Sequence, residues 1–268
     1  RGRSVTEFFA QYGIVLVLVV LVVAMTILSP ILRDGQQLFL TPRNLIQVAL
    51  QAAINAIIAV GMTFVITSGG IDLSVGSTFA LGNIVALALM NVAELPVPAV
   101  IALTLVCGAV VGLVNGVLVG YLRLRAFLTT LVTLIIVRAI VDMLLLKYSV
   151  AIAAAFPDSD LWYYFGEGYV LGIPFSVVVA VVVALGAHLV LSRTRLGWHV
   201  LAVGGSRRSA HNVGISVRRT ICLTYVVSGT LAALSGALIA TRLGGAGADT
   251  GVGLEITALT AAVLGGNS

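Results

Sequence analysis

Charged residues are scarce in this chain of 268 residues. Asp, Glu, Lys and Arg together make up 9% of it, whereas ordinary soluble domains carry roughly 25%. Apolar residues make up 60%. This balance excludes a soluble domain and a nucleic-acid-binding module. It predicts an integral membrane protein that is embedded in the lipid bilayer.

Cysteine and histidine are scarce as well. Cys107 and Cys222 lie far apart inside apolar runs, which argues against a disulfide framework or a zinc site. The three histidines share no metal-ligand spacing. The Gly-rich stretch 244–247 lacks the Lys-Ser/Thr of a phosphate-binding loop. No nucleophile–base pair or paired carboxylate is present, so we predict no metal, no cofactor and no enzymatic activity in this chain.

Long apolar runs are abundant. A helix that crosses the bilayer needs about 20 apolar residues. By that measure, membrane spans are predicted near residues 14–32, 45–67, 72–91, 97–120, 126–147, 170–191 and 220–241, and a last span starts near residue 254. The first run is too long for a signal peptide and lacks a cleavage site, so we interpret it as a retained span. The prediction is an all-α polytopic membrane protein with one transmembrane domain over residues 1–268.

The basic residues predict the orientation, because cytoplasmic loops carry an excess of Lys and Arg. With a cytoplasmic N-terminus, the inner side would hold Arg1, Arg3, Arg123, Arg125, Arg193, Arg195, Arg207, Arg208, Arg218 and Arg219. The outer side would hold only Arg33, Arg43, Lys147 and Arg242. The acidic residues Asp158, Asp160 and Glu167 would lie in an outer loop. A cytoplasmic N-terminus is therefore predicted.

The second and third spans are separated by an unusual break. An apolar run reaches Ser68-Gly69-Gly70, meets the lone acid Asp72, and becomes apolar again after Ser74. Hydrocarbon cannot satisfy free backbone groups, and an acid beside such a break is costly, so these residues are candidates for a gate or a transport pathway. Asp72 could instead cap the third span by accepting from the amides of its first turn.

The other polar residues within spans also allow two interpretations. Thr130 and Thr133 could line a polar pathway, or their hydroxyls could bond to carbonyls of their own helix. Asn55 could line the pathway or form an interhelical hydrogen bond. Arg138 and Asp142 are four residues apart on one helix face, so an ion pair is predicted between them; the alternative is contact with substrate or with a docked binding protein.

Small residues recur at helical spacing in the fourth span. Gly108, Gly112, Gly116 and Gly120 are four residues apart and form a ridge on one face. Small residues let membrane helices approach closely, so a packing surface is predicted. The alternative is that this face slides during a functional movement.

The longest inner segment is the loop at about 192–219, which is predicted to be cytoplasmic. It could be a basic anchor alone, but its order indicates more. Ser206 can cap a short helix over 207–213, and Gly214 can end it. A helix this short is marginal in isolation and needs a partner surface to hold it.

Three segments together resemble one known family. Residues 61–77 resemble the "GMT…ITGGIDLSVGS" signature of permease subunits of bacterial ATP-driven (ABC) sugar importers of the ribose/xylose type, in the branched-chain amino-acid permease superfamily. The loop from Arg193 to Ile215 resembles the "R-T-x-x-G-R…A-[IV]-G-x-N…A-A-x-x-x-G-I" loop of these permeases. Residues 124–138 resemble their fifth span, except that Arg125 stands where Pro is usual.

This resemblance implies an importer permease of roughly ten transmembrane helices, of which about eight are present here and the last are missing. Two permease copies, identical or paralogous, would pair around a central pathway in the inner membrane. A separate ATP-binding subunit would bind ATP and magnesium, and a periplasmic sugar-binding protein would deliver the solute. The resemblance implies that the coupling loop docks into the ATP-binding subunit; its candidate residues are Ser206, Arg207, Arg208, Ala210, His211, Gly214 and Ile215.

The predicted function is therefore import of a sugar, such as a pentose or related polyol, by alternating access. A branched-chain amino-acid-type ABC permease is the near alternative. An ion-coupled secondary transporter is another, although that class should carry coupling charges at mid-depth of the membrane.

Overall fold

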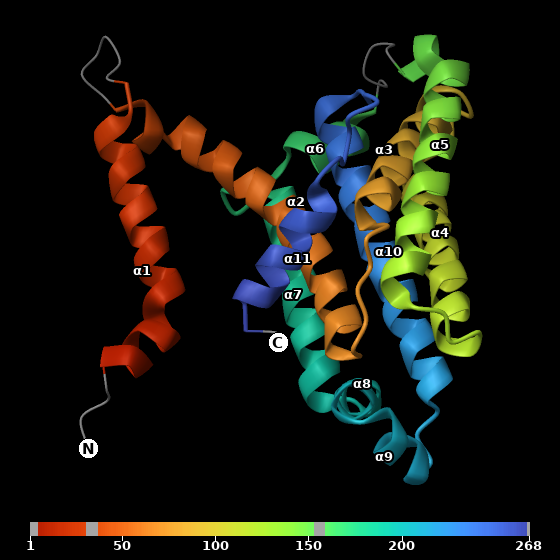
Figure 1. Cartoon of the computed structure of the whole chain (residues 1–268). Helices are drawn as coiled ribbons and strands as arrows, with labels where there is room; N and C mark the ends of the chain where they lie inside the picture. The colour runs from red at the N-terminus through yellow and green to blue at the C-terminus, as the bar shows by residue number, and fades with distance from the viewer. Residues whose placement is uncertain (1–4, 31–36, 153–158, 267–268) are drawn as a thin grey trace. The chain divides into compact units, whose positions relative to one another are not determined.

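The computed structural model describes residues 5–30, 37–152 and 159–266 (Figure 1). Arg1, Arg3, Arg33 and Asp158, which entered the predicted orientation, lie outside the described residues. The chain divides into two compact units, residues 1–51 and 52–268.

The first unit holds α1 (Val5–Leu28), the short 3-10 helix η1 (Leu38–Leu40) and the start of α2 (Pro42–Thr67). The end of α1 is tied to η1, because the Phe39 amide donates to Ser29 Oγ at 2.8 Å and the Leu38 amide donates to the Pro30 carbonyl at 3.0 Å. From Val15 to Leu28 most apolar side chains of α1 are exposed, as expected of a helix that faces lipid.

The second unit continues with α3 (Val75–Asn91), α4 (Val97–Gly116), the π-helical turn η2 (Val117–Tyr121) and α5 (Ala126–Ile152). It then contains α7 (Phe175–Arg193), α8 (Arg195–Gly205), α9 (Arg207–Asn212), α10 (Val217–Leu243) and α11 (Leu254–Leu264). Helix α10 packs along α4 and α3, and α5 packs on α3 (Figure 1). The core of this unit therefore lies around α10.

The all-α membrane fold predicted from the apolar runs is confirmed. Among the described residues, five helices are long and apolar enough to cross a membrane: Pro42–Thr67, Val97–Tyr121, Ala126–Val150, Phe175–Arg193 and Val217–Leu243. Three shorter apolar helices, Val15–Leu28, Val75–Asn91 and Leu254–Leu264, account for the other predicted spans. The observed helix starts lie within a few residues of the predictions, with two exceptions: α1 already begins at Val5, although its apolar part starts at Val15, and Pro174 delays α7 to Phe175.

Two small elements between α5 and α7 were not predicted. Helix α6 (Asp160–Glu167) begins at Ser159, whose side chain accepts from the Trp162 amide, and it buries the Trp162 ring completely. A short hairpin with strands of two residues each follows, with β1 (Tyr169–Val170) antiparallel to β2 (Ile173–Pro174). Its turn places both Leu171 and Gly172 at positive φ, as tight hairpin turns require.

Candidate transport site and coupling surface

The break between α2 and α3 carries a buried carboxylate. Asp72 is 1% exposed, and its carboxylate oxygens accept three hydrogen bonds. Its Oδ1 accepts from the Ser74 amide at 3.0 Å and from Ser74 Oγ at 2.6 Å. Its Oδ2 accepts from Ser228 Oγ of α10 at 2.8 Å. The buried acid is therefore held by partners from two separate parts of the chain.

The same network continues into α4 and α5. Asn115 Nδ2 donates to Ser74 Oγ at 2.8 Å, and Thr133 Oγ1 donates to Asn115 Oδ1 at 2.6 Å. Every side chain in this series is buried. The network thus joins four parts of the fold to Asp72: α5 through Thr133, α4 through Asn115, the break through Ser74 and α10 through Ser228. Buried polar networks in which each member has a partner hold their elements in one arrangement.

The capping role predicted for Asp72 takes a different form. We expected Asp72 to accept from amides in the first turn of the third span, but that helix begins later, at Val75, with Ser74 at its N-cap position. Asp72 lies too far ahead of the helix to reach those amides. It accepts instead from the amide two residues on, which is the geometry of an Asx turn.

The Ser68-Gly69-Gly70 break is held from α9 and α10. Gly69 adopts a positive φ of 78°, and its carbonyl accepts from Arg207 of α9 at 3.3 Å. Ser68 Oγ forms a hydrogen bond with Thr224 Oγ1 at 3.2 Å, and Tyr225 Oη donates to the Ile71 carbonyl at 3.1 Å. The non-helical backbone therefore finds hydrogen-bond partners within the protein, which is one of the conditions under which a membrane protein tolerates such a break.

Two further pathway candidates, Thr130 and Asn55, are not members of this hydrogen-bonded network. Thr130 Oγ1 lies 3.0 Å from the Ala126 carbonyl of its own helix and 3.4 Å from the Ile71 carbonyl at the break. Asn55 is half-buried on α2 and makes none of the network's hydrogen bonds. The structure brings Ser68, Asp72, Ser74, Thr130 and Thr133 to one region of the fold, but it does not bring Asn55 into the hydrogen-bonded group.

The ion pair predicted between Arg138 and Asp142 is wrong. Arg138 Nη1 donates to the Thr250 carbonyl at 2.7 Å and lies 3.4 Å from the Ala248 carbonyl, and no salt bridge joins the two side chains. The loop between α10 and α11 supplies carbonyls that a guanidinium can bind in place of an acid on its own helix. Arg138 therefore anchors this loop to α5.

We expect Arg138→Gln to loosen the loop over residues 244–253. A hydrogen bond from a charged group contributes about 1.5–3 kcal/mol, so thermal stability should fall measurably and hydrogen exchange in the loop should speed up. Asp142→Asn is the matched control, because Asp142 forms no salt bridge with Arg138. Equal effects of the two changes would restore the ion-pair interpretation.

The glycine ridge of α4 lies directly against α10. A Cβ atom on Gly116 would approach the Cys222 carbonyl oxygen to 2.7 Å, and one on Gly120 would approach the Arg218 carbonyl oxygen to 2.8 Å. A Cβ atom on Gly108 would likewise meet the backbone of α10 at Gly229, and one on Gly112 would meet it at Tyr225. Real Cβ atoms essentially never make contacts this short, so α4 and α10 can approach this closely only where side chains are absent.

The loop that is predicted to be cytoplasmic is more ordered than expected. The expected short helix is present as α9, where Ser206 accepts from the Ser209 amide at 3.2 Å and Gly214 follows at a φ of 82°. A second helix, α8, precedes it, with Thr194 as its N-cap. Position 204 on α8 lies so close to the Thr67 carbonyl, at the end of α2, that only glycine fits.

Ala210, one of the candidate docking residues, is not available at the surface. That side chain is 2% exposed and packs inward with Val65, Val203 and Tyr225. Gly214 is exposed. The large apolar side chains exposed in this segment are Trp198 and Leu201 of α8 and Val213 directly after α9, which are 66%, 51% and 75% exposed. We call these three residues the α8–α9 apolar patch.

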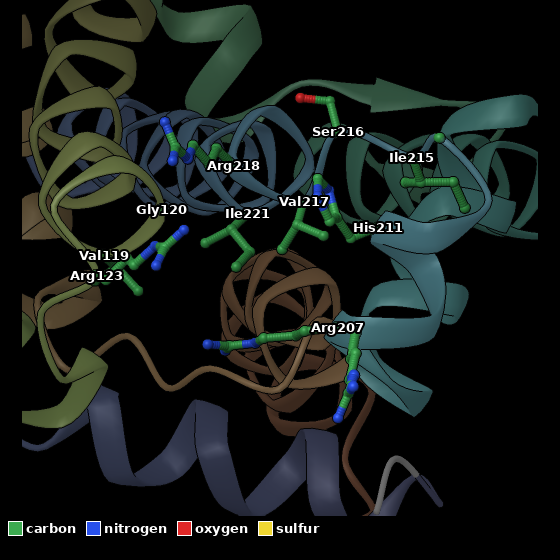
Figure 2. A pocket seen from close by; sticks show the side chains of 12 residues that line it. Val119, Gly120, Arg123, Arg207, His211, Ile215, Ser216, Val217, Arg218 and Ile221 are labelled. Carbon is green, nitrogen blue, oxygen red and sulfur yellow. The ribbon is translucent and has the colours of Figure 1, made fainter.

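A basic pocket of about 860 Å³ lies beside α9 (Figure 2). Its lining includes Arg123, Arg207, Arg208, Arg218 and His211, and none of its lining residues is acidic. Figure 2 shows Arg123 on one side, His211 on the other, and Ile221 and Val217 of α10 between them. The charge of the pocket suits an acidic partner, and the exposed side chains of the α8–α9 apolar patch offer an apolar contact region.

Sequence reasoning missed the partners of Asp72 within the bundle. Asn115 was noticeable as an amide inside a span, but nothing in the sequence distinguishes Ser228 from the other hydroxyls of α10. The Ser68–Thr224 contact joins residues 156 positions apart and has no local signal.

The sequence matches the family described as branched-chain amino acid transport system / permease component over residues 44–268. It is 37% identical over 251 residues to the ribose import permease protein RbsC of Haemophilus influenzae, covering 93% of this chain and 76% of that protein. It is 38% identical over 239 residues to the galactofuranose transporter permease protein YtfT of Escherichia coli K12, with 89% and 67% covered. Identity to the D-allose transport system permease protein AlsC of the same strain is 34% over 261 residues, with 97% and 77% covered. No solved structure matches the chain.

Proposed function

The chain belongs to the permease-component family of branched-chain amino acid transport systems and is a permease of the sugar ABC importer type, and on this premise we propose that it imports a monosaccharide by alternating access, driven by a separate ATP-binding subunit. The relatives named above are sugar permeases, which favours a sugar over a branched-chain amino acid. A periplasmic binding protein and a second permease copy would complete the assembly, with the N-terminus in the cytoplasm.

The observation that carries the proposal is the direct contact between the α8–α9 segment and the break. Arg207 of α9 donates to the Gly69 carbonyl, and Gly204 of α8 abuts the last residue of α2. The break leads within a few residues to Asp72, whose network holds α4, α5 and α10. A displacement of α8 and α9 by a docked subunit would therefore act on the backbone that carries the buried polar network.

The α8–α9 apolar patch is the surface that we propose the ATP-binding subunit contacts. An exposed tryptophan in an interface is often a dominant contributor to binding. The basic pocket beside α9 favours an acidic counterpart on that subunit. ATP and magnesium would be bound by the ATP-binding subunit.

We expect Trp198→Ala to reduce sugar uptake and transport-coupled ATP hydrolysis by about tenfold or more, since interface hot spots contribute roughly 2 kcal/mol. The measurement is uptake into proteoliposomes that contain the cognate ATP-binding subunit and binding protein. Thermal stability should not change, because the side chain is 66% exposed. Leu171→Ala, at a hairpin tip that is 98% exposed, is the control and should transport normally.

Two results would count against this function. Wild-type rates of sugar uptake and ATP hydrolysis in Trp198→Ala would indicate that the α8–α9 segment serves only as a basic anchor at the membrane surface. Uptake of leucine, and of no pentose or hexose, by the wild-type assembly would replace the sugar proposal with the amino-acid alternative.

A further inference from the structure

An apolar groove of about 620 Å³ runs between α4 and α5. Val110 and Val114 line it from α4, Leu118 lines it from η2, and Leu128, Val132 and Ile136 line it from α5. The groove exists because these consecutive helices pack on different neighbours: α4 lies along α10, whereas α5 lies along α3. It is separate from the basic pocket and shares no lining residue with it.

The groove is unsuited to a sugar. Besides Arg125, its polar lining residues are Thr129 and Thr133. Thr129 Oγ1 donates to the Arg125 carbonyl at 2.9 Å, and Thr133 Oγ1 donates to Asn115 Oδ1 at 2.6 Å. Both hydroxyls are satisfied within the protein, so the groove offers a polyhydroxylated solute almost no partners. A hydrocarbon chain is the ligand that such a wall accommodates.

One end of the groove carries a positive charge. Arg125 lines it directly before α5 begins at Ala126, and the residue is exposed. From Arg125 to Ile140, which also lines the groove, α5 rises by about 22 Å. One leaflet contributes about 15 Å of hydrocarbon, half the thickness of a bilayer core. The groove is thus long enough for the acyl chain of one lipid whose headgroup lies at Arg125.

A second copy of the chain fits the groove less well. No Asp or Glu occurs between Glu94 and Asp142, so neither α4 nor the groove-lining part of α5 has an acid to pair with Arg125. A symmetric contact over this face would leave that guanidinium unpaired. A phosphate diester supplies the missing anion, and arginine binds phosphate oxygens with two parallel N–H donors.

We propose that the α4–α5 groove binds one anionic phospholipid of the cytoplasmic leaflet, with an acyl chain along Val132 and Ile136 and the phosphate on Arg125. The leaflet follows from the proposed orientation, in which Arg125 is cytoplasmic. The bound chain lies against the helices that carry Asn115 and Thr133. Its occupancy therefore supports the contact between α4 and α5 next to the Asp72 network.

The headgroup contact is tested by lipid retention. The permease is reconstituted in nanodiscs of phosphatidylcholine mixed with phosphatidylglycerol, released into the gas phase, and its retained lipids are identified by mass spectrometry. We expect wild-type protein to retain one phosphatidylglycerol and Arg125→Gln to retain about fivefold less, as the loss of one basic contact to an anionic lipid implies. Arg195→Gln, which removes a charge from the same predicted side outside the groove, should retain the wild-type amount. Wild-type retention in Arg125→Gln would overturn the proposal.

The acyl-chain contact is tested by filling the groove. Val132 is 55% exposed and lines the groove, whereas Ile135 is 60% exposed and does not line it, so tryptophan at either position is tolerated sterically. Val132→Trp should lose phosphatidylglycerol and Ile135→Trp should keep it. Inorganic phosphate in place of the lipid should give no thermal stabilisation, because it has no chain. If Val132→Trp changes only the oligomeric state and not the lipid, the groove belongs to a second copy and the proposal fails.

Discussion

Replacing Gly112 by leucine is expected to abolish the recovery of folded permease. A Cβ atom at this position would meet the Tyr225 backbone of α10 and would lie 2.8 Å from the Val226 Cα atom. Backbone atoms of a packed helix cannot move aside as the tip of a side chain can. The leucine would force α4 and α10 apart along the contact on which the core of residues 52–268 is built.

Separation of these helices should affect more than one contact. Gly229 of α10 lies against Gly108 and Gly112 from the opposite side, so the approach of the two backbones is mutual. Asn115 follows on the same helix and donates to Ser74, so a displaced α4 also breaks the link to Asp72. Overpacking of a well-filled core costs about 1–3 kcal/mol at sites that can relax, and this site has little room to relax.

The measurement is the fraction of detergent-extracted protein that elutes as a single species, together with its thermal melting. Gly186→Leu on α7 is the matched control, because no atom lies within 4 Å of the position that its Cβ would take. We expect the control to behave as the wild type. Normal yield and melting of Gly112→Leu would mean that the ridge is not a packing surface, and the sliding interpretation would then gain weight.

Local features of the sequence predicted most of the helices. Runs of about 20 apolar residues need no knowledge of tertiary contacts, and the eight predicted spans correspond to observed helices. The α9 helix was predicted because Ser206 and Gly214 are start and stop signals within a few residues. Helix α8 was missed, although Thr194 is a cap and the buried pair Val200 and Val203 has helical spacing. The Arg-rich composition of that loop concealed this signal.

Features that depend on distant partners could not be predicted in the same way. Arg138 has an acid four residues away, but a loop 112 residues further along the chain supplies the Thr250 carbonyl that it binds. Ala210 is exposed if α9 is considered alone and buried once α2 and α10 are in place. The candidate site shows the same division. Asp72 could be identified from its position after two glycines, whereas Ser228 and Asn115 became its neighbours only through the packing of α10 and α4.

The second large effect is expected at Asp72. Substitution by leucine should impair expression and abolish transport, whereas substitution by asparagine should largely preserve them. In Asp72→Leu, three donors lose their acceptors: the Ser74 amide, Ser74 Oγ and Ser228 Oγ. All lie in a buried region, and each stranded donor costs about 1–3 kcal/mol, in a fold whose total stability is of the order of 5–15 kcal/mol. The Ser228 hydroxyl can turn toward a carbonyl of its own helix. The Ser74 amide has no such freedom, so the variant should express poorly and lose transport.

Asparagine preserves the shape and most of the acceptors. Its carbonyl oxygen can take the place of Oδ1 and accept from both Ser74 donors, and its amide then faces Ser228 Oγ, which can rotate to accept instead of donating. Expression, thermal stability and transport are measured side by side for the two variants. We expect Asp72→Asn to fold and to keep much of its transport. Should Asp72→Asn assemble normally and yet transport no better than the leucine variant, the charge of Asp72 rather than its hydrogen bonds would be the feature that transport requires.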